Sequence, residues 1–231
     1  MRLEIIGVNG LPEIAAGDDL ASLISDAADL AEGDVVVVTQ KIVSKAENAM
    51  VAVDPDDPFS HKPVVERESV RVLRRRGDLV ISETKHGFVC ANAGVDRSNV
   101  NPDQAALLPD DPDRSARRIR DAITAKAGVN VGVIVSDTFG RPWRRGVADV
   151  AIGVAGIRPI LDLRGTPDAS GRELQVTEVA IVDELAAAAE LAMGKADGVP
   201  VAVIRGVDPD WFGPGSIQTD LIRPPGEDLF R

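Results

Sequence analysis

Apolar residues recur along the chain at two spacings, one typical of strands and one typical of helices. The four valines at 35–38 form a β-branched run that predicts a strand buried on both faces over residues 34–39, with 50–53 as a candidate partner. Further strands are expected at 2–8, 79–82, 87–91, 130–136 and 200–204. Helices are predicted at 18–28, with Asp18 as the N-cap, and at 64–76, 115–127 and 179–193.

The segments between these elements are polar. Residues 40–48 (QKIVSKAEN) are expected to be a connection, and 54–63 (DPDDPFSHKP), with three prolines and three aspartates, a surface loop. The stretch 94–113 has few periodic apolar positions, and loops of that length usually carry function or move. Strands and helices alternate, but several strands are adjacent. The predicted fold class is therefore α/β (α+β mixed), with mixed sheets and flanking helices.

Composition narrows the classes of function. The 231 residues carry a net charge of -11, with 3% aromatic residues and no Tyr, which argues against broad nucleic-acid binding. One cysteine, Cys90, cannot form an intrachain disulfide, and two histidines cannot assemble a Cys/His zinc site. No apolar run approaches the ~20 residues that a membrane helix needs, and nothing at the N-terminus reads as a signal peptide. A cytoplasmic protein that does not bind membranes is expected.

The common nucleotide signatures, GxxxxGK[ST] and GxGxxG after a strand, are missing, so other polar segments must carry any phosphate chemistry. In NAGVDRSN, residues 92–99, Asp96 and Asn99 offer hard oxygen ligands suited to Mg²⁺ or Mn²⁺. The plainer interpretation of this segment is a turn in which Asp and Asn bond to their own backbone.

The segment SDTFGRPWRRG, residues 136–146, combines a carboxylate with three arginines. Asp137 and Thr138 leave an apolar strand, and Arg144 and Arg145 follow closely. Such a set suits metal-bound phosphate, because guanidinium groups neutralise the charge that builds during phosphoryl transfer; Asp137, Arg144 and Arg145 are thus candidate catalytic residues. The alternative is a solvated arginine cluster.

Three other features are weaker signals. Lys41 and Lys45 could present ammonium groups to phosphates or simply solubilise a connection. The segment GLPEI, residues 10–14, is by itself an ordinary turn with an exposed Glu13. Cys90, within FVCANA, is expected to be a buried, inert thiol rather than a nucleophile.

Taken together, five ordered segments resemble the coenzyme F420:L-glutamate ligases. They are GLPEI, TQKIVSKAEN, NAGVDRSNV, SDTFGRPWRRG and the span from DVAIGVAGI through GRELQVTEVAIVDELAAAAELAMGK, so the match covers nearly the whole chain. The resemblance implies one ligase domain over residues 1–231, with room for two subdomains, in an unusual mixed α/β fold that forms an intertwined homodimer. It also implies an enzyme that uses GTP to activate the carboxylate of a deazaflavin precursor, F420-0, as an acyl phosphate. L-glutamate then attacks, and further γ-linked glutamates can follow. Mg²⁺ or Mn²⁺ is the expected metal, with K⁺ as a helper.

The resemblance also assigns site residues. Those implied to bind GTP are Leu11, Pro12, Glu13, Ile14, Gln40, Lys45 and Asn99. Asp96 and Asp137 correspond to metal-binding aspartates, and Thr138 to a residue that contacts a second metal ion. Archaeal members tend to carry a Glu after the Met-Gly that ends the long helix, where this chain has Lys195. A lysine cannot ligate a metal, so the second site is weaker, completed by other oxygens, or replaced by Lys195 contacting phosphate.

Many bacterial relatives continue beyond a similar LLRP...DLF stretch into a nitroreductase-like domain, which is not present in these 231 residues. One alternative to a ligase is therefore a nucleotide- and metal-binding module that needs such a domain. Another is a metal-dependent phosphohydrolase, which would use the same Asp, Arg and metal set without an amine.

Overall fold

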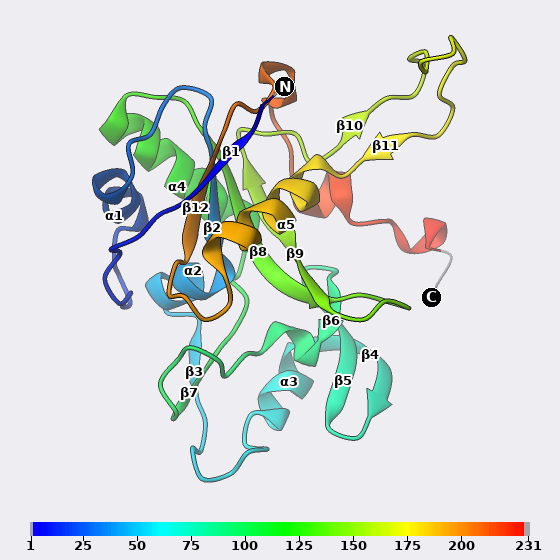
Figure 1. Cartoon of the computed structure of the whole chain (residues 1–231). Coiled ribbons are helices and arrows are strands. Elements are labelled where there is room, and N and C mark those ends of the chain that lie inside the picture. The colour runs from blue at the N-terminus through cyan, green and yellow to red at the C-terminus, as the bar shows by residue number, and fades with distance from the viewer. Residues whose placement is uncertain (1, 229–231) are drawn as a thin grey trace.

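A five-stranded mixed sheet forms the centre of the computed structural model, which describes residues 2–228 (Figure 1). The strand order is β1-β12-β2-β8-β9, and β2 and β8 form the parallel pair while all other neighbours are antiparallel. The bounds are β1 Glu4–Gly7, β2 Val35–Thr39, β8 Gly132–Gly140, β9 Val147–Ala155 and β12 Val201–Arg205. The valines of β2 are fully buried, as their β-branched run predicts. The mixed α/β fold class is therefore confirmed.

Helices cover both faces of this sheet. Helix α5 (Ile181–Met193) packs on one face, against β1, β9 and β12, while α4 (Pro112–Ala127) packs on β8 and β9 at the other face, with α1 (Leu20–Ala27) beside it (Figure 1). Asp19, not Asp18, caps α1 by accepting the Ser22 N–H at 3.1 Å. Helix α4 begins three residues before the expected start, because Asp111 accepts the Arg114 N–H at 2.9 Å.

A second group of elements lies below the main sheet in Figure 1. It contains the two-stranded sheet β3-β7, the three-stranded sheet β4-β5-β6 and helix α3, around a smaller hydrophobic cluster that includes Val64, Val65 and Val80. The bounds are β3 Met50–Ala52, α3 Lys62–Glu68, β4 Ser69–Arg76, β5 Leu79–Thr84, β6 Val89–Ala91 and β7 Gln104–Ala106. Away from both groups, the thin hairpin of β10 (Leu161–Asp162) and β11 (Glu178–Val179) projects outward (Figure 1).

The structure corrects several expectations. Residues 40–46 form helix α2 (Gln40–Ala46) rather than a polar connection, because Gln40, Ile42, Val43 and Ser44 are all buried. The helix predicted over 64–76 ends at Glu68, since β4 then pairs with β5. Strand β3 pairs with β7 instead of β2, and β9 was not predicted at all. The apolar residues Leu229 and Phe230 lie outside the described residues.

One close backbone contact fixes α4 on the sheet. A Cβ at Gly153 in β9 would lie 2.3 Å from the carbonyl oxygen of Pro112, the first residue of α4. We expect Gly153→Ala to lower the free energy of unfolding by about 2–3 kcal/mol, because the helix must shift to relieve the overlap. Urea denaturation measures this loss, with Gly140→Ala as the control because a Cβ at Gly140 would meet nothing within 4 Å. Equal stability of the two variants would contradict this view of the contact.

Candidate active site

A cavity of about 750 Å³ opens where the parallel strands β2 and β8 end. Crevices at the carboxyl ends of parallel strands commonly bind ligands, because loops from neighbouring strands converge there. The structure brings to this cavity most of the residues singled out from the sequence. Those lining it are Leu11, Pro12, Glu13, Ile14, Gln40, Lys45, Asp96, Asn99, Asp137, Thr138 and Lys195.

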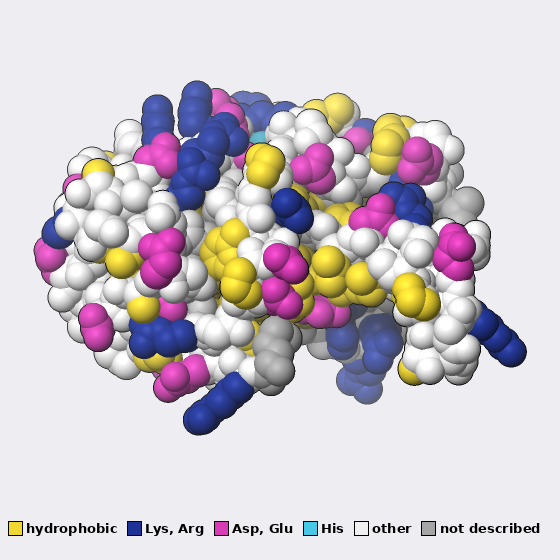
Figure 2. Space-filling view, turned by 90° about the horizontal axis from the view of Figure 1, so that it is seen from above, with side chains coloured by type: hydrophobic (Ala, Val, Ile, Leu, Met, Phe, Trp, Pro, Cys, Tyr) yellow, Lys and Arg dark blue, Asp and Glu magenta, His cyan; other side chains and the backbone are white. Residues whose placement is uncertain are grey.

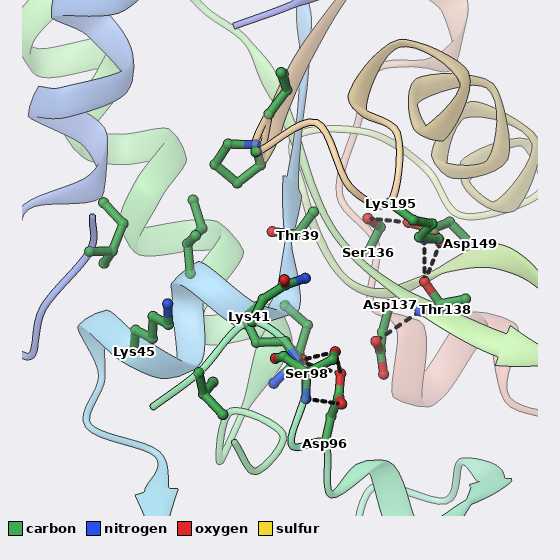
Figure 3. Close-up of a pocket in the computed structure, with 18 of the residues that line it drawn as sticks. Thr39, Lys41, Lys45, Asp96, Ser98, Ser136, Asp137, Thr138, Asp149 and Lys195 are labelled. Atoms are coloured by element: carbon green, nitrogen blue, oxygen red, sulfur yellow. Dashed lines mark hydrogen bonds and ion pairs between the residues drawn. The ribbon is translucent and has the colours of Figure 1, made fainter. Parts of the chain in front are cut away.

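Helix α2 supplies one wall, and its lysines point to two different loops. Lys45 forms an ion pair with Glu13, which joins the loop at 11–14 to the helix. Lys41 forms an ion pair with Asp96 and donates to the Ser98 carbonyl at 2.8 Å (Figure 3). Gln40 is buried and donates its side-chain amide to Ser44 Oγ and to the Leu107 carbonyl. These hydrogen bonds of Gln40 fix the start of α2 to the segment at Leu107.

Asp96 lies on the loop opposite α2 and is held as a carboxylate. Its Oδ1 accepts the Ser98 N–H and its Oδ2 accepts the Ser98 hydroxyl, both at 2.7 Å. Burial acts to raise the pKa of Asp96, but the Lys41 ammonium and the Ser98 hydrogen bonds outweigh it and hold the pKa below the ordinary value. Asp96 is therefore ionised at neutral pH.

Asp137 occupies the cavity floor on β8, with its carboxylate directed toward the Asp96 side (Figure 3). Burial raises its pKa to about 7, the Thr138 N–H that donates to it at 2.8 Å opposes the rise, and the nearby Asp96 charge adds to it. Within residues 2–228 Asp137 forms no salt bridge. A desolvated carboxylate beside a second one is an electrostatic environment that favours a cation.

These two aspartates fit a divalent metal of the magnesium type. Within the described residues no three His, Cys, Asp or Glu side chains gather into a metal-binding group. Mg²⁺ is commonly held by one or two carboxylates and completed by substrate phosphates and water, rather than by an all-protein cage. Asp137, which has no ammonium partner within residues 2–228, and Oδ1 of Asp96, whose Oδ2 is the oxygen paired with Lys41, are the groups that would hold such an ion here.

A third group on the cavity wall contains two carboxylates that the sequence reasoning missed, Asp149 and Glu190. Asp149 lies opposite Thr138 in the β8–β9 ladder, is buried, and accepts hydrogen bonds from Ser136 Oγ at 3.2 Å and Thr138 Oγ1 at 2.6 Å. Glu190 lies on α5. The apolar pattern of residues 147–155 was the signal that could have located Asp149. Assigning this segment as the partner strand of 132–140 places Asp149 opposite Thr138, at the site.

Lys195 joins this group after the sharp turn at Gly194. A positive φ of 63° at Gly194 reverses the chain beyond α5 and brings Lys195 to β8 and β9. Its ammonium forms ion pairs with Asp149 at 2.7 Å and Glu190 at 3.0 Å, and donates to Thr138 Oγ1 (Figure 3). Burial acts to lower the pKa of Lys195, but the bonds to Asp149 and Glu190 outweigh it and raise the pKa above the ordinary value. Lys195 is therefore charged at neutral pH.

Two predicted catalytic residues lie elsewhere. Arg144 and Arg145 are exposed in the turn between β8 and β9 and do not line the cavity. The turn is held by Arg141, which donates to the Arg145 carbonyl at 2.7 Å. A catalytic role for Arg144 and Arg145 stays a prediction.

Cys90 is buried, as expected from its apolar neighbours. Burial raises the pKa of its thiol to about 12, and the nearby Asp137 charge adds to the rise. The thiol is therefore protonated at neutral pH, which argues against a nucleophilic role.

Comparison with known proteins decides the family. Residues 10–206 match the family described as F420-0:Gamma-glutamyl ligase. The chain belongs to this family. The F420-0:gamma-glutamyl ligase match includes every cavity residue named above, from the loop at 11–14 to Lys195.

Curated relatives match this chain over nearly their whole length. The chain is similar to the coenzyme F420:L-glutamate ligase of Methanothermobacter thermautotrophicus, with 44% identity and 100% of both chains covered. It is also 44% identical to the enzyme of that name from Methanopyrus kandleri, covering 95% of this chain and 94% of the relative. The Methanocaldococcus jannaschii ligase is 41% identical, with 100% and 97% covered.

Two surface properties accompany this assignment. None of the helices within residues 2–228 is both long and apolar enough to cross a membrane. On the face in Figure 2, basic and acidic side chains are interspersed.

Proposed function

We propose that this protein is a GTP-dependent ligase that joins L-glutamate to the F420-0 deazaflavin precursor through an amide bond. The observation that carries the proposal is that Asp96, Asp137 and the lysines of α2 line one cavity, in a chain of this family. Carboxylates that can hold Mg²⁺ or Mn²⁺ beside ammonium groups form the arrangement that phosphoryl transfer requires. When bound, the metal would neutralise phosphate oxygens.

The reaction balances in two steps. A carboxylate oxygen of F420-0 attacks the γ-phosphorus of GTP, GDP leaves, and an acyl phosphate forms. The amine of L-glutamate then attacks the acyl carbon, inorganic phosphate leaves, and the amine loses a proton. Repeating both steps on the new γ-carboxylate adds further γ-linked glutamates.

The residues of this chain serve those steps by position and charge. Lys45 lies along one wall and pairs with the exposed Glu13, so its ammonium group can donate its other hydrogens to phosphate oxygens as a point charge. Lys41 instead holds Asp96 and Ser98 on the neighbouring loop. The loop at 11–14 and Asn99 border the same space and are the proposed contacts for the rest of GTP. The cavity of about 750 Å³ lies within the volume range typical of small-molecule sites.

Further parts of the proposal follow the family resemblance. We include K⁺ as a helper cation, a homodimer as the assembly and the cytoplasm as the location. Light scattering tests the homodimer directly. Rates measured with K⁺ replaced by tetramethylammonium test the effect of the cation.

Mass spectrometry of the reaction products tests the activity. The protein is incubated with F420-0, GTP, Mg²⁺ or Mn²⁺ and L-glutamate, and we expect products larger by successive glutamate residues. Arms with ATP in place of GTP, and with glutamate omitted, accompany the full reaction. Phosphate release without glutamate would indicate a phosphohydrolase. Nucleotide binding with no product would indicate a module that needs another domain.

A further inference from the structure

The ammonium group of Lys195 is fully bonded within the protein. A lysine has three N–H donors and no acceptor. In Lys195 these donors meet Thr138 Oγ1, Asp149 Oδ1 at 2.7 Å and Glu190 Oε1 at 3.0 Å. Donation to a phosphate would therefore require Lys195 to give up one of these partners.

The three acceptors come from three different elements of the fold. Thr138 is on β8, Asp149 is on β9 and Glu190 is on α5. The Asp149 side chain is 1% exposed and also accepts the hydroxyl hydrogens of Thr138 and Ser136. Two carboxylates and a hydroxyl form a set of hard oxygen donors, which a divalent ion would otherwise favour.

The resemblance to the family implies a second metal ion that Thr138 contacts, and the residues here do not fit one. A metal ion on the oxygens of Thr138 and Asp149 would have to occupy the space that the Lys195 ammonium already fills. Placed beside the ammonium instead, the ion would be repelled strongly, because both groups are positively charged. We propose that the Lys195 ammonium is a resident cation in place of a second metal, so that each chain takes one divalent ion, at Asp96 and Asp137. This inference rests on the proposed metal-dependent function and specifies its metal content.

A lysine differs from a bound metal in two ways that matter for the site. It supplies one positive charge instead of two, and it does not dissociate into solution. Lys195 is accordingly a positioning residue: it fixes Thr138 and Asp149 at the wall beside Asp137 and neutralises part of the Asp149 and Glu190 charge.

Counting bound Mn²⁺ by electron paramagnetic resonance tests the inference without using activity. The full-length protein is titrated with Mn²⁺ in the presence of GDP. We expect about one ion per chain for the wild type and for Lys195→Arg, which keeps the cation. Lys195→Ala and Lys195→Glu are expected to gain about one further ion, because the oxygens of Asp149, Glu190 and Thr138 lose their ammonium partner. Lys126→Ala, which breaks an exposed ion pair with Asp26, controls for the change in net charge.

The outcomes separate cleanly. A gain in Lys195→Ala and Lys195→Glu, without a gain in Lys195→Arg or Lys126→Ala, supports the inference, and thermal melting confirms that each variant is folded. Two ions of similar affinity in the wild type would overturn the inference. So would the absence of a further ion in Lys195→Ala, in Lys195→Glu, or in both. Failure of the proposed function appears instead as the absence of glutamate addition in the mass spectra, whatever the Mn²⁺ count.

Discussion

Asp137→Asn is expected to lower the rate of glutamate addition by roughly 10²–10³-fold, the range seen when one preorganised electrostatic contact is removed from an active site. The amide keeps the shape of the side chain and its acceptor for the Thr138 N–H but loses the negative charge at the cavity floor. The rate is measured from product formation with saturating GTP. Asp121→Asn, on the exposed side of α4 where Asp121 pairs with Arg120, serves as the control and is expected to retain full activity.

The same substitution has an opposite effect on stability. The pKa of Asp137 is about 7 in the folded protein against an ordinary value of 3.8, so the folded state binds the proton more tightly than the unfolded chain. In the metal-free protein, the contribution of the Asp137 carboxyl to the free energy of unfolding therefore falls as pH rises from about 4 to about 7. The loss is complete above that window. Asp137→Asn should raise the melting temperature of the metal-free protein at pH 8 and change it little at pH 4. A lower melting temperature at pH 8 would contradict this assignment.

The largest loss of stability is expected at Asp113, a buried carboxylate in the first turn of α4. It accepts the Val154 N–H at 2.8 Å, the Ser216 hydroxyl at 2.7 Å and the Ile217 N–H at 3.1 Å, and so joins α4, β9 and the segment 217–221. Asp113→Ala is expected to lower the free energy of unfolding by about 3–5 kcal/mol, because buried donors lose a charged acceptor.

Urea denaturation measures this effect. Asp121→Ala, in the same helix but exposed and paired only with its neighbour Arg120, is the matched control and is expected to change stability by less than about 0.5 kcal/mol. Asp113→Asn should lie between the two, since it keeps one acceptor oxygen. If Asp113→Ala were as stable as the control, the three hydrogen bonds would not hold these segments together.

Features that depend on neighbouring residues in the chain could be predicted from the sequence. The valines of β2 are β-branched and apolar on both faces, so they form a central strand in any fold that covers both sides. The Ala-rich helix α5 ends close to the predicted residue, where Gly194 adopts the left-handed region. Most of the predicted site residues, including Asp96 and Asp137, do line the cavity, because they lie in the distinctive segments on which the resemblance to the family rests.

Other features depended on partners far away in the sequence. The polar segment 40–46 is helical because Gln40 and Ser44 bond to the Leu107 carbonyl, more than 60 residues away. The basic run 69–76 contains residues that suit a helix, yet it forms β4 because it pairs with β5 from Ser69 to Arg76, with two register shifts along the ladder. In each case the intrinsic preference of the residues for helix or strand is weak, so hydrogen bonds to distant segments decide the conformation, as is common for short elements.

The sequence by itself thus determined the family, the central strands and the side chains that could serve phosphate and metal chemistry. Only the tertiary structure decided how those side chains pair: Lys41 with Asp96, and Lys195 with Asp149 and Glu190. The physical reason is that the type of a side chain is local, whereas its charge balance depends on which groups the fold places within a few ångströms. In the sequence, Lys195 is only a departure from the Glu that archaeal members tend to carry. In the structure, it is a cation bound by residues of β8, β9 and α5.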